Sequence, residues 1–455
     1  MRKTGARAAL TAAAAGATAY LAARPTLVSW PARMRPAFVT TLGVTSAGLA
    51  WLAAGNVGLR SGPAPTLRRR AARGAAAASA VAASVALGEV ARRRLSARLA
   101  DGGRQQDAGF STPPAQPTVS GGPGSLVDHA TLGREGARFV GDLTSSESIE
   151  QVMGVPAVRE PIRVFVGLDS AGTPEERVRL AMAELHRTGA FDRAYLMVES
   201  PAGSGYANPA PVEVLETLSL GDCATVVVGY GLLPSFLSLD RVSLASRTQQ
   251  LLIEAVAEEI AGRERKPRLL LYGESLGARV QQAGIPGGTA DLDRLGVHAA
   301  LWVGTPGGAS SVAFHSAVSG ESITIDRPEQ IPDPLPSPRP RVWFLEHDGD
   351  PVVRFEPTVA YRRPPWLAER PRGRNVPEQM AWTPGVTWAQ LLVDTVFATD
   401  IKPGKFESHG HDYRADLGGT VPAAFGFDVD AGIATRLEAT LREREIARAE
   451  RLGEA

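Results

Sequence analysis

The chain has 455 residues, with 49 lysines and arginines against 48 aspartates and glutamates, so its formal net charge is +1. That length predicts two or three regions, and the balanced charge, without interleaved aromatic and basic residues, argues against a nucleic-acid-binding protein. The one cysteine, Cys223, cannot form an internal disulfide, and no Cys/His pairs stand at ligand spacing, so we expect no metal and no cofactor.

Residues 1–100 are rich in alanine, leucine and arginine and contain three apolar stretches, at about 8–23, 37–59 and 74–91. The middle stretch has no charged residue and exceeds the ~20 residues that cross a bilayer. We expect an α-helical, multi-pass region in the cell membrane, with a soluble alanine-rich helical hairpin as the alternative. Eight basic residues would face one side and seven the other, so the side on which the rest of the chain lies stays undecided.

Residues 101–160 are rich in glycine, proline and serine, which predicts a linker ending in a segment docked on the next domain. From residue 161 to 455, β-branched apolar runs alternate with amphipathic stretches. This alternation predicts one α/β domain with a mostly parallel sheet and helices on both faces. The expected strands cover 162–168, 193–199, 224–230, 269–273, 298–304 and 341–347. The expected helices cover 174–188, 211–219, 247–262 and 432–452, with a further helix after residue 275.

One strand runs directly into Gly273-Glu274-Ser275-Leu276-Gly277, which has the pattern G-x-S-x-G between a strand and a helix. In this context the tight turn lifts a serine hydroxyl above the sheet as a nucleophile. A side chain at Gly273 or Gly277 would collide with the neighbouring strand or helix. The alternative is an ordinary serine at a strand-to-helix junction.

An oxyanion hole needs two backbone N–H groups, one from the residue after the nucleophile, here Leu276. The second is expected from the glycine-rich loop after strand 193–199, which offers Ala202, Gly203 and Ser204. A plain glycine-rich turn is an equal alternative. No G-x-G-x-x-G follows a first strand, which argues against a dinucleotide site.

A serine nucleophile requires a histidine base and a carboxylate that orients it. Asp350 follows the strand 341–347, and two histidines, His409 and His411, stand near the end of the chain. The order Ser275, Asp350, His411 is the one that this strand-turn-helix pattern requires. Asp350 could instead be a turn residue beside Gly349, and the histidines could be surface groups. His411 is preferred for its Gly-His-x-Tyr setting, with His409 as the alternative base.

Two long proline- and arginine-rich segments, 306–340 and 352–388, predict a cover over the serine. Trp366, Trp382 and Trp388 lie in the second segment, where indole rings beside charged groups suit a surface that meets lipid head groups. The alternative is that these rings only pack the cover onto the sheet.

The chain resembles a family of bacterial membrane α/β-hydrolases, in which an N-terminal multi-helix membrane region precedes an α/β-hydrolase catalytic domain. The resemblance covers most of residues 117–416 and is carried by "ELHRTGAFDR", "GDCATVVVGYGLLPS", "GESLGA", "ALWVGTPG", "DPVV", "MAWTPGVTWAQ" and "GHDY". It places the family's serine, aspartate and histidine on Ser275, Asp350 and His411. The implied protein is a serine hydrolase of esterase or lipase type.

The membrane region favours an amphiphilic or lipid-like acyl ester as the substrate, processed through an acyl-enzyme. An acyltransferase with the same triad is one alternative, because the covalent intermediate would be the same. A catalytically inactive membrane-tethered scaffold is the other, because a fold alone does not establish activity.

Overall fold

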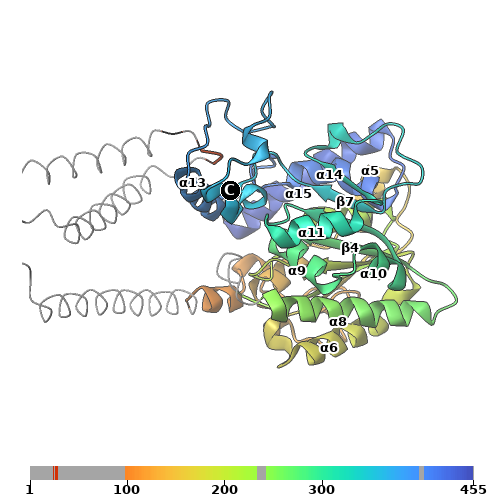
Figure 1. The fold of residues 1–455 in the computed structure, drawn as a ribbon. Helices are drawn as coiled ribbons and strands as arrows, with labels where there is room; N and C mark the ends of the chain where they lie inside the picture. Colours follow the sequence, from red (N-terminus) through yellow and green to blue (C-terminus); the bar gives the residue numbers. More distant parts are fainter. Residues whose placement is uncertain (1–23, 25, 29–97, 233–241, 399–403, 454–455) are drawn as a thin grey trace, which may run out of the picture.

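The computed structural model describes residues 24, 26–28, 98–232, 242–398 and 404–453 (Figure 1). The three apolar stretches predicted to cross a membrane lie outside these residues. Within the described ranges, no helix is both long enough and apolar enough to cross a bilayer. The division of the chain at residues 100 and 160 stays a prediction.

The centre of the domain is a seven-stranded sheet with the order β1-β3-β2-β4-β5-β7-β6, and all neighbouring strands are parallel. Its strands are β1 Ile162–Val166, β2 Tyr195–Ser200, β3 Cys223–Val228, β4 Arg268–Glu274, β5 Val297–Val303, β6 Ser322–Ile325 and β7 Val342–Leu345. Every residue of β1, β3 and β7 is buried, as expected for strands covered on both faces. The prediction of a mostly parallel α/β sheet is confirmed.

Helices cover both faces of this sheet (Figure 1). On one face α6, α8 and α9 pack in a row, and on the other α5, α7, α14 and α15 pack together. The α-helices are α4 Gly133–Val140, α5 Ser146–Met153, α6 Pro174–Thr188, α7 Pro209–Leu218, α8 Val242–Ala261, α9 Leu276–Gly284, α10 Thr289–Arg294, α11 Ala309–Val318, α12 Pro351–Arg354, α13 Val386–Phe397, α14 Arg414–Phe425 and α15 Ala431–Leu452.

The bounds of α6 agree with the predicted helix because its end signals are local. The Thr173 side chain accepts from the Glu176 N–H, and the Glu176 carboxylate accepts from the Thr173 N–H, which closes a capping box. Pro174 occupies the first turn, and Gly189 ends the helix with a φ of 70°.

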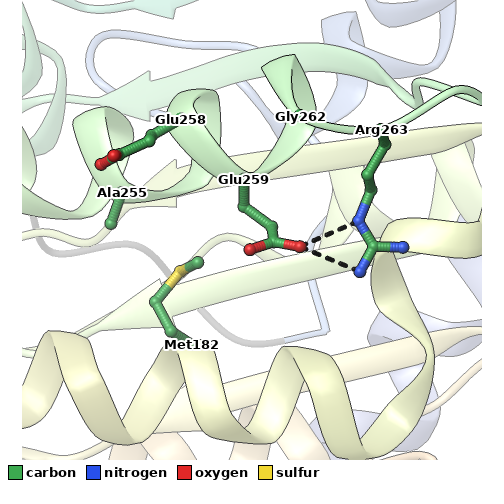
Figure 2. A pocket seen from close by; sticks show the side chains of 6 residues that line it. All are labelled: Met182, Ala255, Glu258, Glu259, Gly262 and Arg263. Carbon is green, nitrogen blue, oxygen red and sulfur yellow. Dashed lines mark hydrogen bonds and ion pairs between the residues drawn. The ribbon is translucent and has the colours of Figure 1, made fainter.

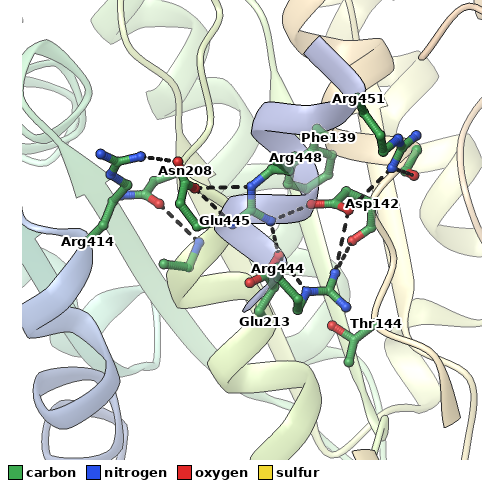
Figure 3. Close-up of polar contacts among 12 residues, drawn as sticks. Phe139, Asp142, Thr144, Asn208, Glu213, Arg414, Arg444, Glu445, Arg448 and Arg451 are labelled. Carbon is green, nitrogen blue, oxygen red and sulfur yellow. Dashed lines mark hydrogen bonds and ion pairs between the residues drawn. The ribbon is translucent and has the colours of Figure 1, made fainter. Parts of the chain in front are cut away.

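The expected linker is packed against the domain over much of its length. Phe110, Val119 and Val127 are buried, and Val119 pairs in parallel with Arg163 of β1. Further along, Asp142 anchors the last helix of the chain (Figure 3).

α15 docks on the domain through one stripe at four-residue intervals, formed by Leu437, Leu441, Glu445 and Ala449. Arg448 bonds both Asp142 and Glu213 of α7, and Arg444 lies 3.0 Å from Glu213 (Figure 3). Burial favours the neutral form of Asp142, but the guanidinium groups of Arg448 and Arg444 outweigh it and lower the pKa of this carboxyl group. The ion pairs therefore join the end of the chain to the segment before β1.

The two predicted cover segments differ from expectation in different ways. Segment 306–340 was expected to be an irregular cover, but it supplies α11 and the edge strand β6. Segment 352–388 is largely irregular and forms a second hydrophobic cluster with α13, made of Val359, Leu367, Val376, Met380 and Leu391. Trp366, Trp382 and Trp388 pack against this cluster, and buried Leu27 completes it. The Leu27 N–H donates to Asp394 Oδ2 at 3.0 Å, so part of the N-terminal region is docked on the cover.

Candidate active site

The turn between β4 and α9 holds Ser275 in a backbone conformation that L-residues rarely adopt, with φ 57° and ψ −126°. A Cβ on Gly273 would lie 2.9 Å from Ala278 in α9, and one on Gly277 would lie 2.2 Å from the Ser200 carbonyl oxygen. Both distances are shorter than any ordinary contact, so the tight turn requires glycine at both positions. Ser275 is 8% exposed and stands at the carboxyl edge of the sheet.

Asp350 lies five residues after β7, at the N-terminus of α12, and is fully buried. Its Oδ1 accepts from the Val352 N–H at 2.8 Å. Its Oδ2 accepts from the Tyr413 hydroxyl and lies 2.7 Å from His411 Nδ1. Because three donors converge on one carboxylate, the His411 hydrogen is assigned to Nδ1 and the lone pair to Nε2.

His411 Nε2 is buried and has no hydrogen-bond partner within the described part of the chain. Burial disfavours the charged ring, but Asp350 outweighs this effect and raises the pKa of His411 above its ordinary value. A buried imidazole with a free lone pair and a carboxylate on its other nitrogen is the arrangement of a general base.

One short segment, Val303–Gly304, lies against both Ser275 and His411. The Ser275 N–H donates to the Val303 carbonyl at 2.8 Å, and a Cβ on Gly304 would lie 2.9 Å from His411 Cε1. The hydrogen bond from the serine hydroxyl to Nε2 is not formed in this structure. Such bonds are often long in the absence of substrate and tighten when it binds.

The alternative base His409 is exposed, and its backbone pairs with Asp412. No hydrogen bond joins its ring to Asp350 or to any other described residue. The structure brings His411, and not His409, to Asp350.

The candidate oxyanion donors are only partly compatible with the structure. Leu276 begins α9, where the first N–H groups of a helix have no partner within the helix. The expectation for Ala202 is wrong, because its N–H already donates to the Tyr206 carbonyl at 2.8 Å. Gly203 and Ser204 remain candidates. The start of their loop lies against the serine turn, where the Ser200 and Pro201 carbonyls face Gly277.

Comparison with protein families agrees with the fold. A family model described as the alpha/beta-hydrolase family matches residues 162–321 and 311–423, and a model of that family's N-terminus matches residues 5–142. The chain belongs to the alpha/beta-hydrolase family. No curated protein and no solved structure matches this chain.

A pair of carboxyl groups next to the serine turn, the partly buried Glu274 and the buried Glu199, was not predicted from the sequence. Glu274 accepts from Asn208 Nδ2 at 2.6 Å and from the Tyr272 hydroxyl at 2.9 Å. Glu199, on the neighbouring strand, is buried with Oε2 unbonded to any described residue. Burial raises the pKa of both carboxyl groups. Glu274 could have been considered from the G-E-S-L-G motif, but no local pattern predicts its pairing with Glu199.

The described ranges contain no group of three or more histidine, cysteine, aspartate or glutamate side chains that could hold a metal ion. They do contain one depression that has no part in this site. A depression between α6 and α8 is lined by Met182, Ala255, Glu258, Glu259, Gly262 and Arg263 (Figure 2). It lies near the end of α8 that leads into β4, at the opposite edge of the sheet from Ser275.

Proposed function

We propose that this protein is a serine hydrolase that cleaves an acyl ester through an acyl-enzyme. Ser275 attacks the acyl carbonyl, His411 Nε2 takes the hydroxyl proton and returns it to the leaving alcohol, and Asp350 orients the ring and stabilises its charged form. The Leu276 N–H and one from Gly203 or Ser204 hold the oxyanion. Water then attacks the acyl-enzyme, with His411 acting again as the base.

One observation carries this proposal. His411 donates to buried Asp350 through Nδ1, while its buried Nε2 is left without a partner among the described residues, one short segment away from a strained serine. A histidine kept only for packing would be expected to have both ring nitrogens satisfied or exposed. An inactive scaffold would have no reason to retain both the strained serine and an unsatisfied imidazole nitrogen.

Acyl transfer is a second candidate, favoured by the low exposure of the reacting groups. Ser275 is 8% exposed and His411 is 3% exposed, so little water can reach the position of an acyl-enzyme. Exclusion of water is what allows another acceptor to compete for the acyl group. Product analysis with a labelled ester and added alcohols separates the two reactions, because transfer gives a new ester in place of the free acid.

We also propose that residues 1–100 anchor the protein in the cell membrane as a multi-pass region, as in the bacterial membrane hydrolases that the sequence resembles. The charge-free stretch 37–59 supports this proposal, and the docking of Leu27 joins the region to the cover. An enzyme held at a bilayer would meet amphiphilic esters. Esters of increasing chain length, assayed with and without lipid vesicles, test this substrate class. Preference for acetyl esters, unchanged by vesicles, would contradict it.

Labelling by a fluorophosphonate probe tests the hydrolase proposal itself. The full-length chain must be used, because removal of residues 1–97 would remove Leu27 from the cover. We expect the wild-type protein and the control Ser316→Ala, an exposed serine on α11, to be labelled equally, and Ser275→Ala to remain unlabelled. Equal labelling of Ser275→Ala would reject Ser275 as the nucleophile. Absence of labelling and of ester cleavage in the wild type would favour the inactive scaffold.

A further inference from the structure

A second cluster of serine, histidine and aspartate lies beside the candidate site. His347 follows β7 and is 1% exposed. Its Nε2 lies 2.7 Å from Asp416 Oδ2 and 3.1 Å from Ser408 Oγ, and its Nδ1 lies 2.8 Å from the Gly410 carbonyl oxygen. Gly410 is the residue before His411, so these contacts join the end of β7 to the loop that carries the candidate base.

The partners of His347 determine where its hydrogens are. A carbonyl oxygen can only accept, so Nδ1 must donate to Gly410. The Asp416 carboxylate also accepts, because Arg374 donates to it at 3.0 Å and the Ser408 hydroxyl makes a short bond to the same oxygen. Burial raises the pKa of Asp416, but the hydrogen bonds with His347, Ser408 and Arg374 outweigh it and lower this pKa. A neutral His347 would therefore direct a lone pair at one of two oxygen atoms less than 3 Å away.

This arrangement argues against Ser408 as a second nucleophile. For His347 to activate this serine, a lone pair of its ring would have to take the hydroxyl proton. In this cluster the Ser408 hydroxyl donates to Asp416, and both ring nitrogens of His347 lie within hydrogen-bond distance of oxygens that accept. Ser408, His347 and Asp416 thus have the residue types of a catalytic triad without its arrangement of proton donors and acceptors. Their contacts indicate a different role.

We propose that His347 donates from both ring nitrogens, to Gly410 and to Asp416, and thereby acts as a positioning residue that holds the loop 408–413 and the orientation of His411. This proposal rests on the function proposed above. Two further contacts act in the same direction. The His347 ring stacks on Tyr413 with ring centroids 3.8 Å apart, and the His347 backbone N–H donates to the Tyr413 hydroxyl at 3.0 Å. That hydroxyl donates in turn to Asp350.

The charged groups around this cluster are themselves paired. Arg374 bridges Asp416 and Asp326, and the Asp326 carboxylate accepts from the Asp348 N–H at 2.8 Å. The His347 ring is therefore surrounded by paired charged groups: Asp416 from α14, Asp326 from the loop after β6 and Arg374 from the cover. Loss of its two hydrogen bonds would release Gly410 and allow the His411 ring to move relative to Ser275.

Nuclear magnetic resonance of the full-length protein, labelled with ¹⁵N in its seven histidines, tests the hydrogen positions directly. At the pH of the activity assay, we expect the His347 ring to show protons on both nitrogens, its signals being identified by their loss in His347→Gln. Detection of a single ring proton on His347 would overturn the proposal. The ring protons are measured on the wild type and without catalysis, and the variant serves only to assign the signals.

Kinetics then test the positioning role. Glutamine cannot donate in both directions from separate atoms, so we expect His347→Gln to lower kcat about 10- to 100-fold with little change in KM. The rate of fluorophosphonate labelling at Ser275 should fall in parallel. The matched control His298→Gln replaces an exposed histidine at the start of β5 and should keep the wild-type rate. A folded His347→Gln protein with wild-type kcat would refute the positioning role, whereas an unlabelled wild type would refute the proposed function instead.

Discussion

The substitution Gly304→Ala probes the position of the His411 ring without changing a reacting group. Gly304 follows β5 with φ +56°, and a Cβ there would lie 2.7 Å from Tyr413 Cε2 and 2.9 Å from His411 Cε1. Ordinary carbon contacts begin near 3.4 Å, so the His411 ring would have to retreat by about 0.5 Å. The strand offers its own control in Gly296, which precedes β5 with φ +63° and has no atom within 4 Å of its Cβ position.

The two substitutions share one destabilising effect and differ in the other. An alanine at either site adopts a left-handed conformation, which costs about 1–2 kcal/mol of the free energy of unfolding. Gly304→Ala adds overpacking against two buried rings, at about 1–3 kcal/mol. Displacement of a catalytic group by about 1 Å can lower a rate roughly 100-fold. We therefore expect at least about a tenfold loss of kcat in Gly304→Ala and none in Gly296→Ala.

Denaturant unfolding and ester turnover, measured on both variants, give the required comparison. We expect that stability falls in both proteins, further in Gly304→Ala, and that kcat falls only in Gly304→Ala. If Gly304→Ala loses no more stability than Gly296→Ala and retains wild-type kcat, then the His411 ring is not where catalysis needs it.

Three further predictions concern the acid, the base and the cover. Asp350→Asn should lower kcat about 10⁴-fold, measured by ester turnover in the folded variant, because an amide favours the wrong tautomer of His411; a loss below about tenfold would remove Asp350 from the mechanism. The raised pKa of His411 places the acidic limb of kcat/KM above pH 6.5, the value for an ordinary histidine, since the base must be neutral. The raised pKa of His411 also stabilises the folded state below pH 6.5, and this stabilisation is lost as the pH rises through the raised pKa. Activity and thermal stability should therefore change in opposite directions with pH, and parallel changes would contradict the assignment. Leu27→Ala should destabilise the cover by about 2 kcal/mol and speed its cleavage by trypsin at the arginines of 362–374, whereas an unchanged cleavage rate would show that the docked segment does not hold the cover.

The architecture could be predicted where the signals were local and periodic. α6 has a capping box, a proline at its start and a glycine at its end, and its bounds were correct. β6 was missed because it has four residues and only one of them is buried. α14 was missed because Gly418, Gly419 and Pro422 interrupt its sequence, although its buried face packs on α7 and β5. Tertiary packing outweighed weak helix propensity in that segment.

The candidate site divides in a similar way. A motif and the order of residues along the chain were enough to nominate Ser275, Asp350 and His411. The sequence could not show that the Ala202 N–H is used within its own loop, because that bond depends on the path of the backbone. It also could not show that His347 reaches Gly410, since the two are 63 residues apart and meet only in the folded chain.

The central claim is that Ser275 carries the acyl group during turnover. Full-length protein quenched in acid during turnover of a slowly hydrolysed ester can be digested with trypsin and analysed by mass spectrometry. Cleavage after Arg268 and Arg279 gives one peptide, 269–279, in which Ser275 is the only serine. We expect this peptide to gain the mass of the acyl group and to fragment with the added mass on Ser275, and we expect no adduct in Ser275→Ala. Continued turnover with an unmodified peptide 269–279, or with the acyl group on another residue, would contradict it.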